Sequence, residues 1–125
     1  MNKFVLDASV VLAFLNREPG FETIAALLEE AAISAVNVAE AATKLADKGA
    51  NRIQETIREL KLEIMDFDEH LAYRAAALRR ATRKTGLSLG DRACLATAQK
   101  LGVPAVTADR KWAQLRLDVE IQVVR

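Results

Sequence analysis

The sequence predicts an α/β fold: a three-layer α/β/α domain whose helices cover both faces of a central parallel sheet of four to five strands. Short apolar runs alternate with longer segments of helical periodicity along the whole chain. The length of 125 residues corresponds to one domain, taken as residues 1–125. Apolar residues make up 51% of the chain, so a domain of this size can form its core without disulfides.

Short apolar runs bounded by turn residues predict the strands. They are expected at residues 4–6, 32–34, 62–67, 105–107 and 120–124. Parallel strands need long crossover connections, which are right-handed and usually helical. Ligands of such sheets bind beyond the carboxyl ends of the strands, at a switch in strand order, so the residues that directly follow strands are candidates for a site.

Apolar residues that recur every three or four positions predict the helices. They are expected at residues 9–16, 22–30, 37–48, 50–60, 69–84, 89–101 and 111–115. Residues that end helices stand at several of the breaks: Pro19 with Gly20, then Gly49, Gly86 and Gly102.

Composition and charge argue against several classes of protein. Cys94 is the only cysteine, so no intrachain disulfide is expected and a reducing, cytoplasmic compartment is indicated. Asp7 interrupts the apolar start before it reaches the length of a signal peptide, and no segment reaches the roughly 20 apolar residues of a membrane span. The net charge of +1 gives no general attraction to nucleic acid, so such a site must depend on a local patch.

Acidic residues stand where the predicted strands end. Asp7 follows the first strand, Asp109 follows the fourth, and Asp91 lies at the start of a helix. Each has a purely structural explanation, because Asp7 and Asp109 fit helix N-caps and Ser88 with Asp91 fits a capping box. A helix cap uses one carboxylate oxygen, so the other oxygen can still bind a metal ion.

Glu40 is harder to explain as a surface residue, because the stretch around it is almost entirely apolar. A solvated helix face would carry more charge at the positions three and four residues away. An ordinary ion pair with Lys44 is the alternative.

Several carboxylates in one place would need a cation. If the first and fourth strands are neighbours, Asp7 and Asp109 flank one crevice. Two carboxylates about 5 Å apart repel by roughly 3 kcal/mol at an effective dielectric near 20, so a larger group requires protonation or a bound ion. Ligands that are all oxygen suit Mg²⁺ or Mn²⁺ and not zinc.

Four segments resemble the motifs of PIN-domain nucleases. They are residues 5–9 (VLDAS), 34–40 (SAVNVAE), 87–96 (LSLGDRACLA) and 106–112 (VTADRKW). They occur in order along the whole chain, and more narrowly they resemble the VapC toxins of bacterial toxin–antitoxin pairs. The resemblance implies a PIN-like fold and an endoribonuclease that depends on Mg²⁺ or Mn²⁺. It also implies a homodimer and a small VapB-like antitoxin as the partner that silences it.

The resemblance also assigns residues. It implies that the acidic metal site and catalytic centre consist of Asp7, Glu40, Asp91 and Asp109, supported by the hydroxyls of Ser9 and Thr107. A bound ion would activate water for in-line attack on an RNA phosphodiester, leaving 5′-phosphate and 3′-hydroxyl ends. Asp7 and Asp109 are the first candidates for direct ligands, and Asp91 is the next. Glu40 either binds the ion or orients the water. The target RNA and the number of ions stay open.

Phosphate contacts need local positive charge. The candidates for RNA contact are Arg83, Lys84, Arg92, Arg110 and Lys111. The first two end a basic run that a solvated helix face explains equally well. Trp112 could stack on a base, but a buried anchor for the last helix is favoured. Cys94 lies among small apolar residues and is interpreted as core.

Other functions share some of these features. A phosphate-receiver signalling domain needs paired acids after the first strand, where Asp7 stands alone, and an aspartyl phosphohydrolase needs a second aspartate where the chain has Ser9. A catalytically silent PIN-fold binding module is a third alternative, against which the complete acidic set argues. His70 is the only histidine, which excludes a ribonuclease with a histidine pair, and with no serine elbow for it to serve it also argues against a Ser-His-Asp hydrolase.

Overall fold

A computed structural model describes residues 2–124 of the protein; the ends of the predicted domain, Met1 and Arg125, lie outside the described residues. Within that range, five strands form one sheet in the order β3-β2-β1-β4-β5, and every pairing is parallel. The strands are β1 (Phe4–Leu6), β2 (Ala31–Ser34), β3 (Glu63–Met65), β4 (Ala105–Thr107) and β5 (Ile121–Val123). The predicted fold class is confirmed, and β1 and β4 are neighbours.

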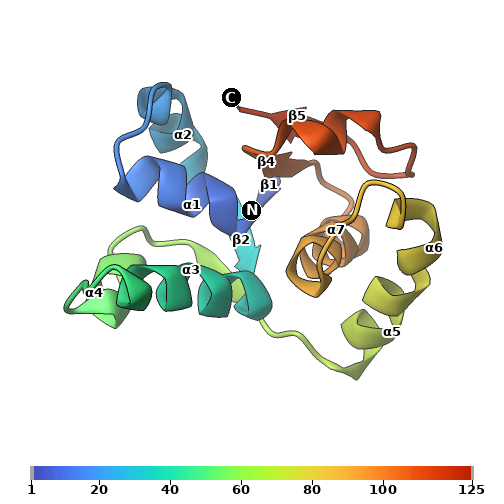
Figure 1. Ribbon diagram of the computed structural model, residues 1–125, viewed down its shortest axis with the longest axis horizontal. Coiled ribbons are helices and arrows are strands. Elements are labelled where there is room, and N and C mark those ends of the chain that lie inside the picture. Colours follow the sequence, from blue (N-terminus) through green and yellow to red (C-terminus); the bar gives the residue numbers. More distant parts are fainter. Residues whose placement is uncertain (1, 125) are drawn as a thin grey trace.

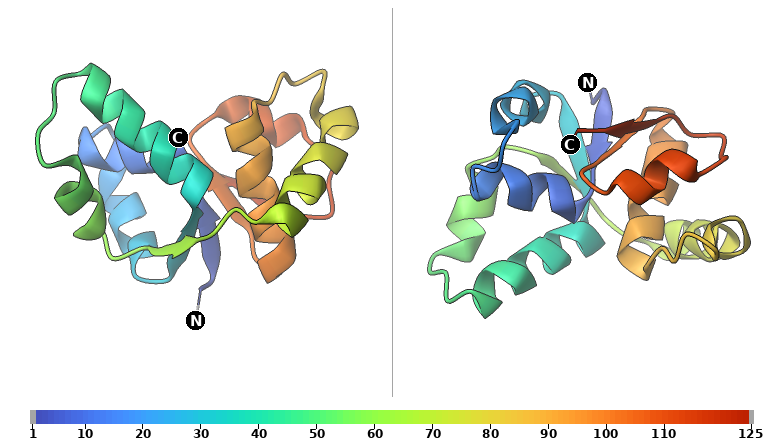
Figure 2. Two further views of the ribbon diagram at one scale, coloured as in Figure 1. Left: turned by 90° about the horizontal axis from the view of Figure 1, so that it is seen from below. Right: turned by 45° about the horizontal axis from the view of Figure 1, so that its top comes forward.

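The sheet lies between two layers of helices (Figure 1). One layer consists of α1 (Ala8–Leu15), α2 (Phe21–Leu28), α3 (Ala35–Asp47) and α4 (Ile53–Arg58). The other consists of α5 (Glu69–Ala77), α6 (Arg79–Thr82), α7 (Leu89–Leu101) and the 3₁₀ helix η1 (Arg110–Gln114). Figure 2 shows the connection after β3 crossing from the first layer to the second. Helices of the N-terminal half therefore cover one face of the sheet, and those of the C-terminal half cover the other.

Successive side chains of a strand point to opposite faces of the sheet, so the core has one part under each layer of helices. Val5 packs in the cluster that includes α5, α7 and Trp112, whereas the next residue, Leu6, packs with Val10 beneath α1 and α2. Trp112 is fully buried, so the prediction of a buried anchor is confirmed. Cys94 is also fully buried, as predicted for a core residue.

The prediction of one continuous helix at residues 69–84 is wrong in one respect, because two helices, α5 and α6, meet at Leu78. The Leu78 N–H donates to the carbonyl of Ala75, only three residues back, at 3.2 Å, so the helix tightens there. The same carbonyl accepts from Arg92 Nη1 at 3.1 Å, and the Thr82 hydroxyl donates to Leu78 O at 2.8 Å. Side chains that intrude on the backbone ladder in this way bend helices.

Other observed helix and strand boundaries differ from the predicted ones by a few residues. α4 begins at Ile53 and not at residue 50, because Arg52 has a left-handed backbone with φ of 54°. β3 is shorter than the predicted 62–67, since it pairs only along the length of β2. The last predicted helix is the 3₁₀ helix η1, shifted one residue toward the N-terminus. Among residues 2–124, no helix has the length and apolar character that crossing a membrane requires.

Candidate active site

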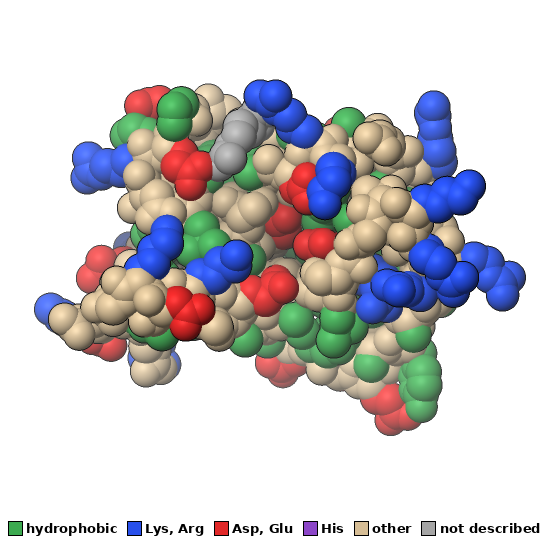
Figure 3. Space-filling model, in the orientation of Figure 1, with side chains coloured by type: hydrophobic (Ala, Val, Ile, Leu, Met, Phe, Trp, Pro, Cys, Tyr) green, Lys and Arg blue, Asp and Glu red, His purple; other side chains and the backbone are tan. Residues whose placement is uncertain are grey.

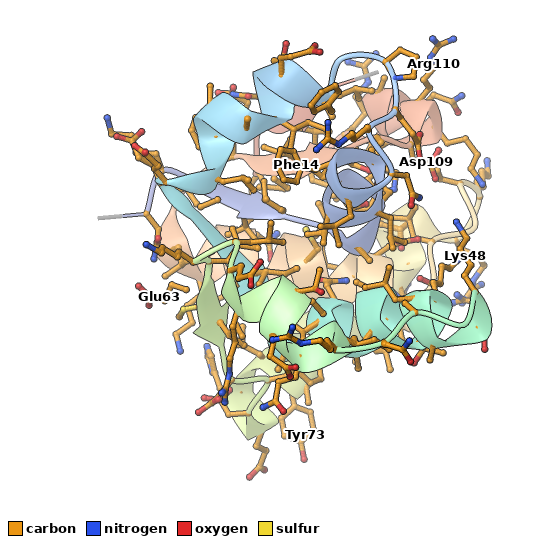
Figure 4. All side chains as sticks on the ribbon, turned by 90° about the vertical axis from the view of Figure 1, so that its left-hand side faces the viewer. Phe14, Lys48, Glu63, Tyr73, Asp109 and Arg110 are labelled. Carbon is orange, nitrogen blue, oxygen red and sulfur yellow. The ribbon has the colours of Figure 1, made fainter. Side chains whose placement is uncertain are left out.

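The four acidic residues singled out from the sequence line one pocket at the carboxyl end of the sheet. Asp7 follows β1, Asp109 follows the neighbouring β4, Glu40 lies on α3 and Asp91 lies in the first turn of α7. Figure 3 shows Asp and Glu side chains gathered in the middle of this face, with Lys and Arg around them. Figure 4 shows Asp109 at this edge of the molecule and Glu63, at the start of β3, at the opposite edge. Strand order therefore brings together side chains that lie far apart in the sequence.

Asp7 is held on both carboxylate oxygens. Its Oδ1 accepts from the Ser9 hydroxyl at 2.6 Å and from the Val10 N–H at 3.2 Å, which caps α1. Its Oδ2 accepts from the Thr107 hydroxyl at 2.7 Å, across the β1–β4 pair. The two hydroxyls are fixed in turn, because Ser9 Oγ accepts from the Ala108 N–H at 2.9 Å and Thr107 Oγ1 accepts from the Asp109 N–H at 3.0 Å. The structure thus places the hydroxyls of Ser9 and Thr107 against the Asp7 carboxylate, whereas the resemblance implied only that they support the acidic site.

Burial is the main electrostatic feature of Asp7, whose residue is only 4% exposed. Desolvation raises the pKa of Asp7 from 3.8 to about 6, against the lowering effect of the hydrogen bonds from Ser9, Thr107 and Val10. The negative charge of Asp91 raises the pKa of Asp7 as well, but it contributes less than burial. Above pH 6 the pocket therefore holds a carboxylate whose charge is poorly solvated, and a cation would stabilise it.

The caps expected from the sequence are present and use part of each carboxylate. Asp91 Oδ2 accepts from the Ser88 N–H at 2.9 Å, and the Ser88 hydroxyl accepts from the Asp91 N–H, which completes the predicted capping box. Asp109 Oδ1 accepts from the Lys111 N–H at 3.0 Å at the start of η1. Each of these aspartates has a second oxygen, so capping and binding of an ion are compatible.

Glu40 is held by Asn37 and Gly90, to which the sequence assigned no role. Its Oε1 accepts from Asn37 Nδ2 at 2.8 Å, and its carboxylate lies against the bare Cα of Gly90. Lys44 lines the same pocket, but no ion pair joins it to Glu40. The signal in the sequence was the spacing of Asn37 and Glu40, since residues three apart share a helix face.

The basic candidates for RNA contact differ in their placement. Arg83 and Lys84 follow α6 and are exposed. Figure 3 shows Lys and Arg side chains gathered on the side of the molecule where Figure 1 labels α6. Arg110 and Lys111 are exposed beside Asp109. Arg92 lies next to Asp91 in sequence, but its guanidinium donates to Ala75 O and so is directed toward α5.

The donor set suits a hard divalent ion. The pocket is lined by four carboxylates and the Ser9 hydroxyl, and it has a volume of about 210 Å³. Mg²⁺ and Mn²⁺ prefer oxygen ligands, and Mg²⁺ usually keeps several of its waters, for which a pocket of this size has room. Among residues 2–124, no three acidic, His or Cys side chains already stand in metal-binding geometry. The residues fit the ion chemically, but the four carboxylates are not all turned to one point.

Burial excludes Cys94 from this donor set. The thiol lies beneath the pocket, fully buried, and its Sγ is 4.0 Å from Val5 O. Burial, followed by the charges of Asp7, Asp91 and Glu40, raises the pKa of Cys94 well above its ordinary value. A protonated thiol in this position is a core residue and not a ligand.

Comparison with known proteins agrees with this geometry. The PIN domain family matches the chain over residues 4–117. The chain is a PIN-domain protein. The matched segment contains all four acids of the pocket, together with Ser9 and Thr107. Comparison with curated protein sequences gives no match.

Solved structures with the same fold include toxin–antitoxin complexes and a toxin. A toxin–antitoxin complex from Klebsiella pneumoniae is 23% identical, with 88% of this chain and 90% of that one covered and a TM-score of 0.69. DNA-bound VapBC from Salmonella typhimurium is 18% identical, with both chains covered completely and a TM-score of 0.71. VapC20 from Mycobacterium tuberculosis, a toxin that cleaves the sarcin-ricin loop, is 16% identical, with coverages of 94% and 98% and a TM-score of 0.71. At these identities the likeness shows the fold, which the sequence predicted.

Proposed function

We propose that this PIN-domain protein is an endoribonuclease dependent on Mg²⁺ or Mn²⁺, and the toxin of a type II toxin–antitoxin pair. The observation that carries the proposal is the meeting of four carboxylates, from four separate segments, in one pocket at the carboxyl end of the sheet. Burial of the ionised Asp7 side chain, whose pKa is raised, lowers the stability of the fold. Carboxylates with such raised pKa values cluster at functional sites. A bound divalent ion would add positive charge beside the four carboxylates and activate water for attack on a phosphodiester.

The residues of the chain have separate tasks in this proposal. Asp7 is the rigid member, because three hydrogen bonds fix both of its oxygens. Asp91 and Asp109 each use one oxygen for a helix cap and offer the other to the ion. Glu40 either binds the ion or accepts a proton from the attacking water. Arg110 and Lys111, beside Asp109, are placed to contact phosphates that flank the cut.

The partners belong to the same proposal. The solved structures of similar fold include VapBC and FitAB, each bound to DNA. We propose a small VapB-like antitoxin for this chain, a homodimer as the active form, and the cytoplasm as the place where it meets its RNA. Co-expression with the neighbouring open reading frame tests the first point: rescue of growth and co-purification support it, and toxicity unaffected by that frame contradicts it.

Cleavage of structured RNA tests the activity. We expect cuts with Mg²⁺ or Mn²⁺ that leave 5′-phosphate ends, and none in EDTA. Asp7→Asn removes a pocket carboxylate while keeping an acceptor for the α1 cap, so it should abolish cleavage with the fold retained. Asp68→Asn is the matched control, because Asp68 caps α5 outside the pocket and is exposed.

Four outcomes would contradict the proposal. Cleavage that persists in EDTA, or in the Asp7→Asn variant, would remove the mechanism. Formation of an acyl phosphate on Asp7 from a small phosphodonor, without RNA cleavage, would favour a receiver-like signalling domain instead. Metal binding without any cleavage would favour a catalytically silent binding module.

A further inference from the structure

Asn37 joins the two helices that carry Glu40 and Asp91. Its side chain is fully buried, and its Nδ2 donates to Glu40 Oε1 at 2.8 Å and to the carbonyl of Gly90 at 3.0 Å. Both partners are oxygen acceptors, so the amide must present nitrogen and not oxygen to them. The carbonyl of Gly90 belongs to the peptide unit that leads into Asp91. One neutral side chain on α3 therefore sets the position of Glu40 relative to the start of α7.

Gly90 is required for a reason other than backbone freedom. The other four glycines have positive φ, whereas Gly90 lies within α7 in an ordinary helical conformation that alanine would adopt more readily. A Cβ on Gly90 would overlap the Glu40 carboxylate, on its Cδ and on both oxygens. The missing side chain of Gly90 is the space in which the Glu40 carboxylate lies.

We propose that Asn37 and Gly90 are positioning residues that form a seat for Glu40 and hold its carboxylate ready for the ion. The inference rests on the proposed function only in that the pocket binds a divalent cation. A glutamate free on a helix surface samples many rotamers, and ordering it on binding lowers affinity. The seat orders the Glu40 side chain before the ion binds, so binding does not have to order it. Its donor is a neutral amide, which orients the carboxylate without supplying the positive charge that a lysine would bring against the ion.

Gly90→Ala separates this role from stability. The overlap involves the end of a flexible side chain, so Glu40 moves and the fold is kept. Alanine also has the higher helix propensity, so the unfolding midpoint should be unchanged or higher. We expect the dissociation constant for Mn²⁺, measured from the electron paramagnetic resonance signal of the free ion, to rise about 10- to 100-fold, as for other residues that orient metal ligands. Leu89→Ala is the control, because Leu89 is exposed and adjacent to Gly90 in the same helical turn.

A double-mutant cycle shows whether Gly90 acts through Glu40. In a Glu40→Ala background there is no carboxylate for the new Cβ to displace, so Gly90→Ala should leave Mn²⁺ affinity unchanged. Asn37→Ala should weaken Mn²⁺ binding in the wild-type background and have a smaller effect in the Glu40→Ala background, where only its hydrogen bond to the Gly90 carbonyl is left to lose. Thr82→Val is its control for reduced stability, because Thr82 is also fully buried and hydrogen-bonded but lies on α6.

NMR of the Asn37 side-chain amide detects the seat in the metal-free protein. In wild-type protein the side-chain amide protons of Asn37 should exchange slowly with water, and in Gly90→Ala and Glu40→Ala their exchange and chemical shifts should change. Unchanged Asn37 resonances in both variants would show that the seat does not exist. Altered resonances with unchanged Mn²⁺ affinity would show that it does not position a ligand. Absence of Mn²⁺ binding by the wild-type protein would overturn the proposed function, and with it the role of the seat in metal binding.

Discussion

Replacement of Asp7 by Asn should stabilise the metal-free protein at neutral pH. The carboxylate is buried, and its pKa is raised from 3.8 to about 6, chiefly by desolvation. One pKa unit corresponds to about 1.4 kcal/mol, so the ionised side chain costs the folded state about 3 kcal/mol. Asparagine has the same shape and no charge to desolvate. Loss of one favourable hydrogen bond offsets the gain by about 1 kcal/mol. We therefore expect a net gain of about 2 kcal/mol.

The sign and the pH window follow from the direction of the pKa change. Because the folded pKa of Asp7 lies above the unfolded value, the folded protein keeps a proton that the unfolded chain releases between pH 3.8 and about 6. The unfolding free energy attributable to Asp7 therefore falls as pH rises through this window and stays low above it. The advantage of Asp7→Asn should be largest above pH 7 and should disappear below pH 4.

Urea denaturation in EDTA, at several pH values between 4 and 8, measures this difference directly. Asp68→Asn is the control, because Asp68 is exposed and the hydrogen bond from the Leu71 N–H holds its pKa below the ordinary value, so its replacement should give no gain. An advantage of Asp7→Asn that is absent at pH 7.5, or equal at pH 4 and pH 8, would show that desolvation of the ionised Asp7 carboxylate does not destabilise the fold.

Three further predictions follow from the same structure. Thr107→Val removes the hydroxyl that donates to Asp7 Oδ2, so carboxyl NMR titration should show the pKa of Asp7 rising above about 6; a lower value would contradict this. Trp112→Ala should lower the unfolding free energy by about 3–5 kcal/mol in urea without changing Mn²⁺ affinity, because Trp112 is a fully buried anchor. Arg83→Ala with Lys84→Ala should lower RNA affinity and reduce the slope of log K against log salt by about 0.7 for each phosphate that the variant no longer neutralises, and an unchanged slope would exclude these residues from the interface.

Much of the fold and the gathering of the acids could be predicted, because both depend on local pattern and on the rules of parallel sheets. A strand followed by an aspartate, as at Asp7 and Asp109, locates the carboxyl edge of the sheet once β1 and β4 are neighbours. The capping box of Ser88 and Asp91 was visible as a spacing of three residues, and the helix that it begins has the predicted bounds.

The features that could not be predicted depend on interactions between elements distant in sequence. Asn37 bonds to the carbonyl of Gly90, 53 residues away, and no local pattern shows that pairing. The break at Leu78 arises partly because Arg92 donates a hydrogen bond to Ala75 O. Repulsion between neighbouring charges was expected to destabilise the metal-free site, whereas desolvation raises the pKa of Asp7 more than the charge of Asp91 does. The burial of Asp7 arises from tertiary packing, which no local pattern in the sequence shows.

We propose that at least one divalent ion binds in the pocket formed by Asp7, Glu40, Asp91 and Asp109. A crystal structure with Mn²⁺, using the anomalous signal of the metal, tests it most directly. We expect an anomalous peak in this pocket, coordinated by carboxylate oxygens that include Asp7 and Asp109, and its loss in Asp7→Asn. Manganese bound elsewhere on the protein, or a pocket that stays empty at saturating Mn²⁺ and neutral pH, would contradict it.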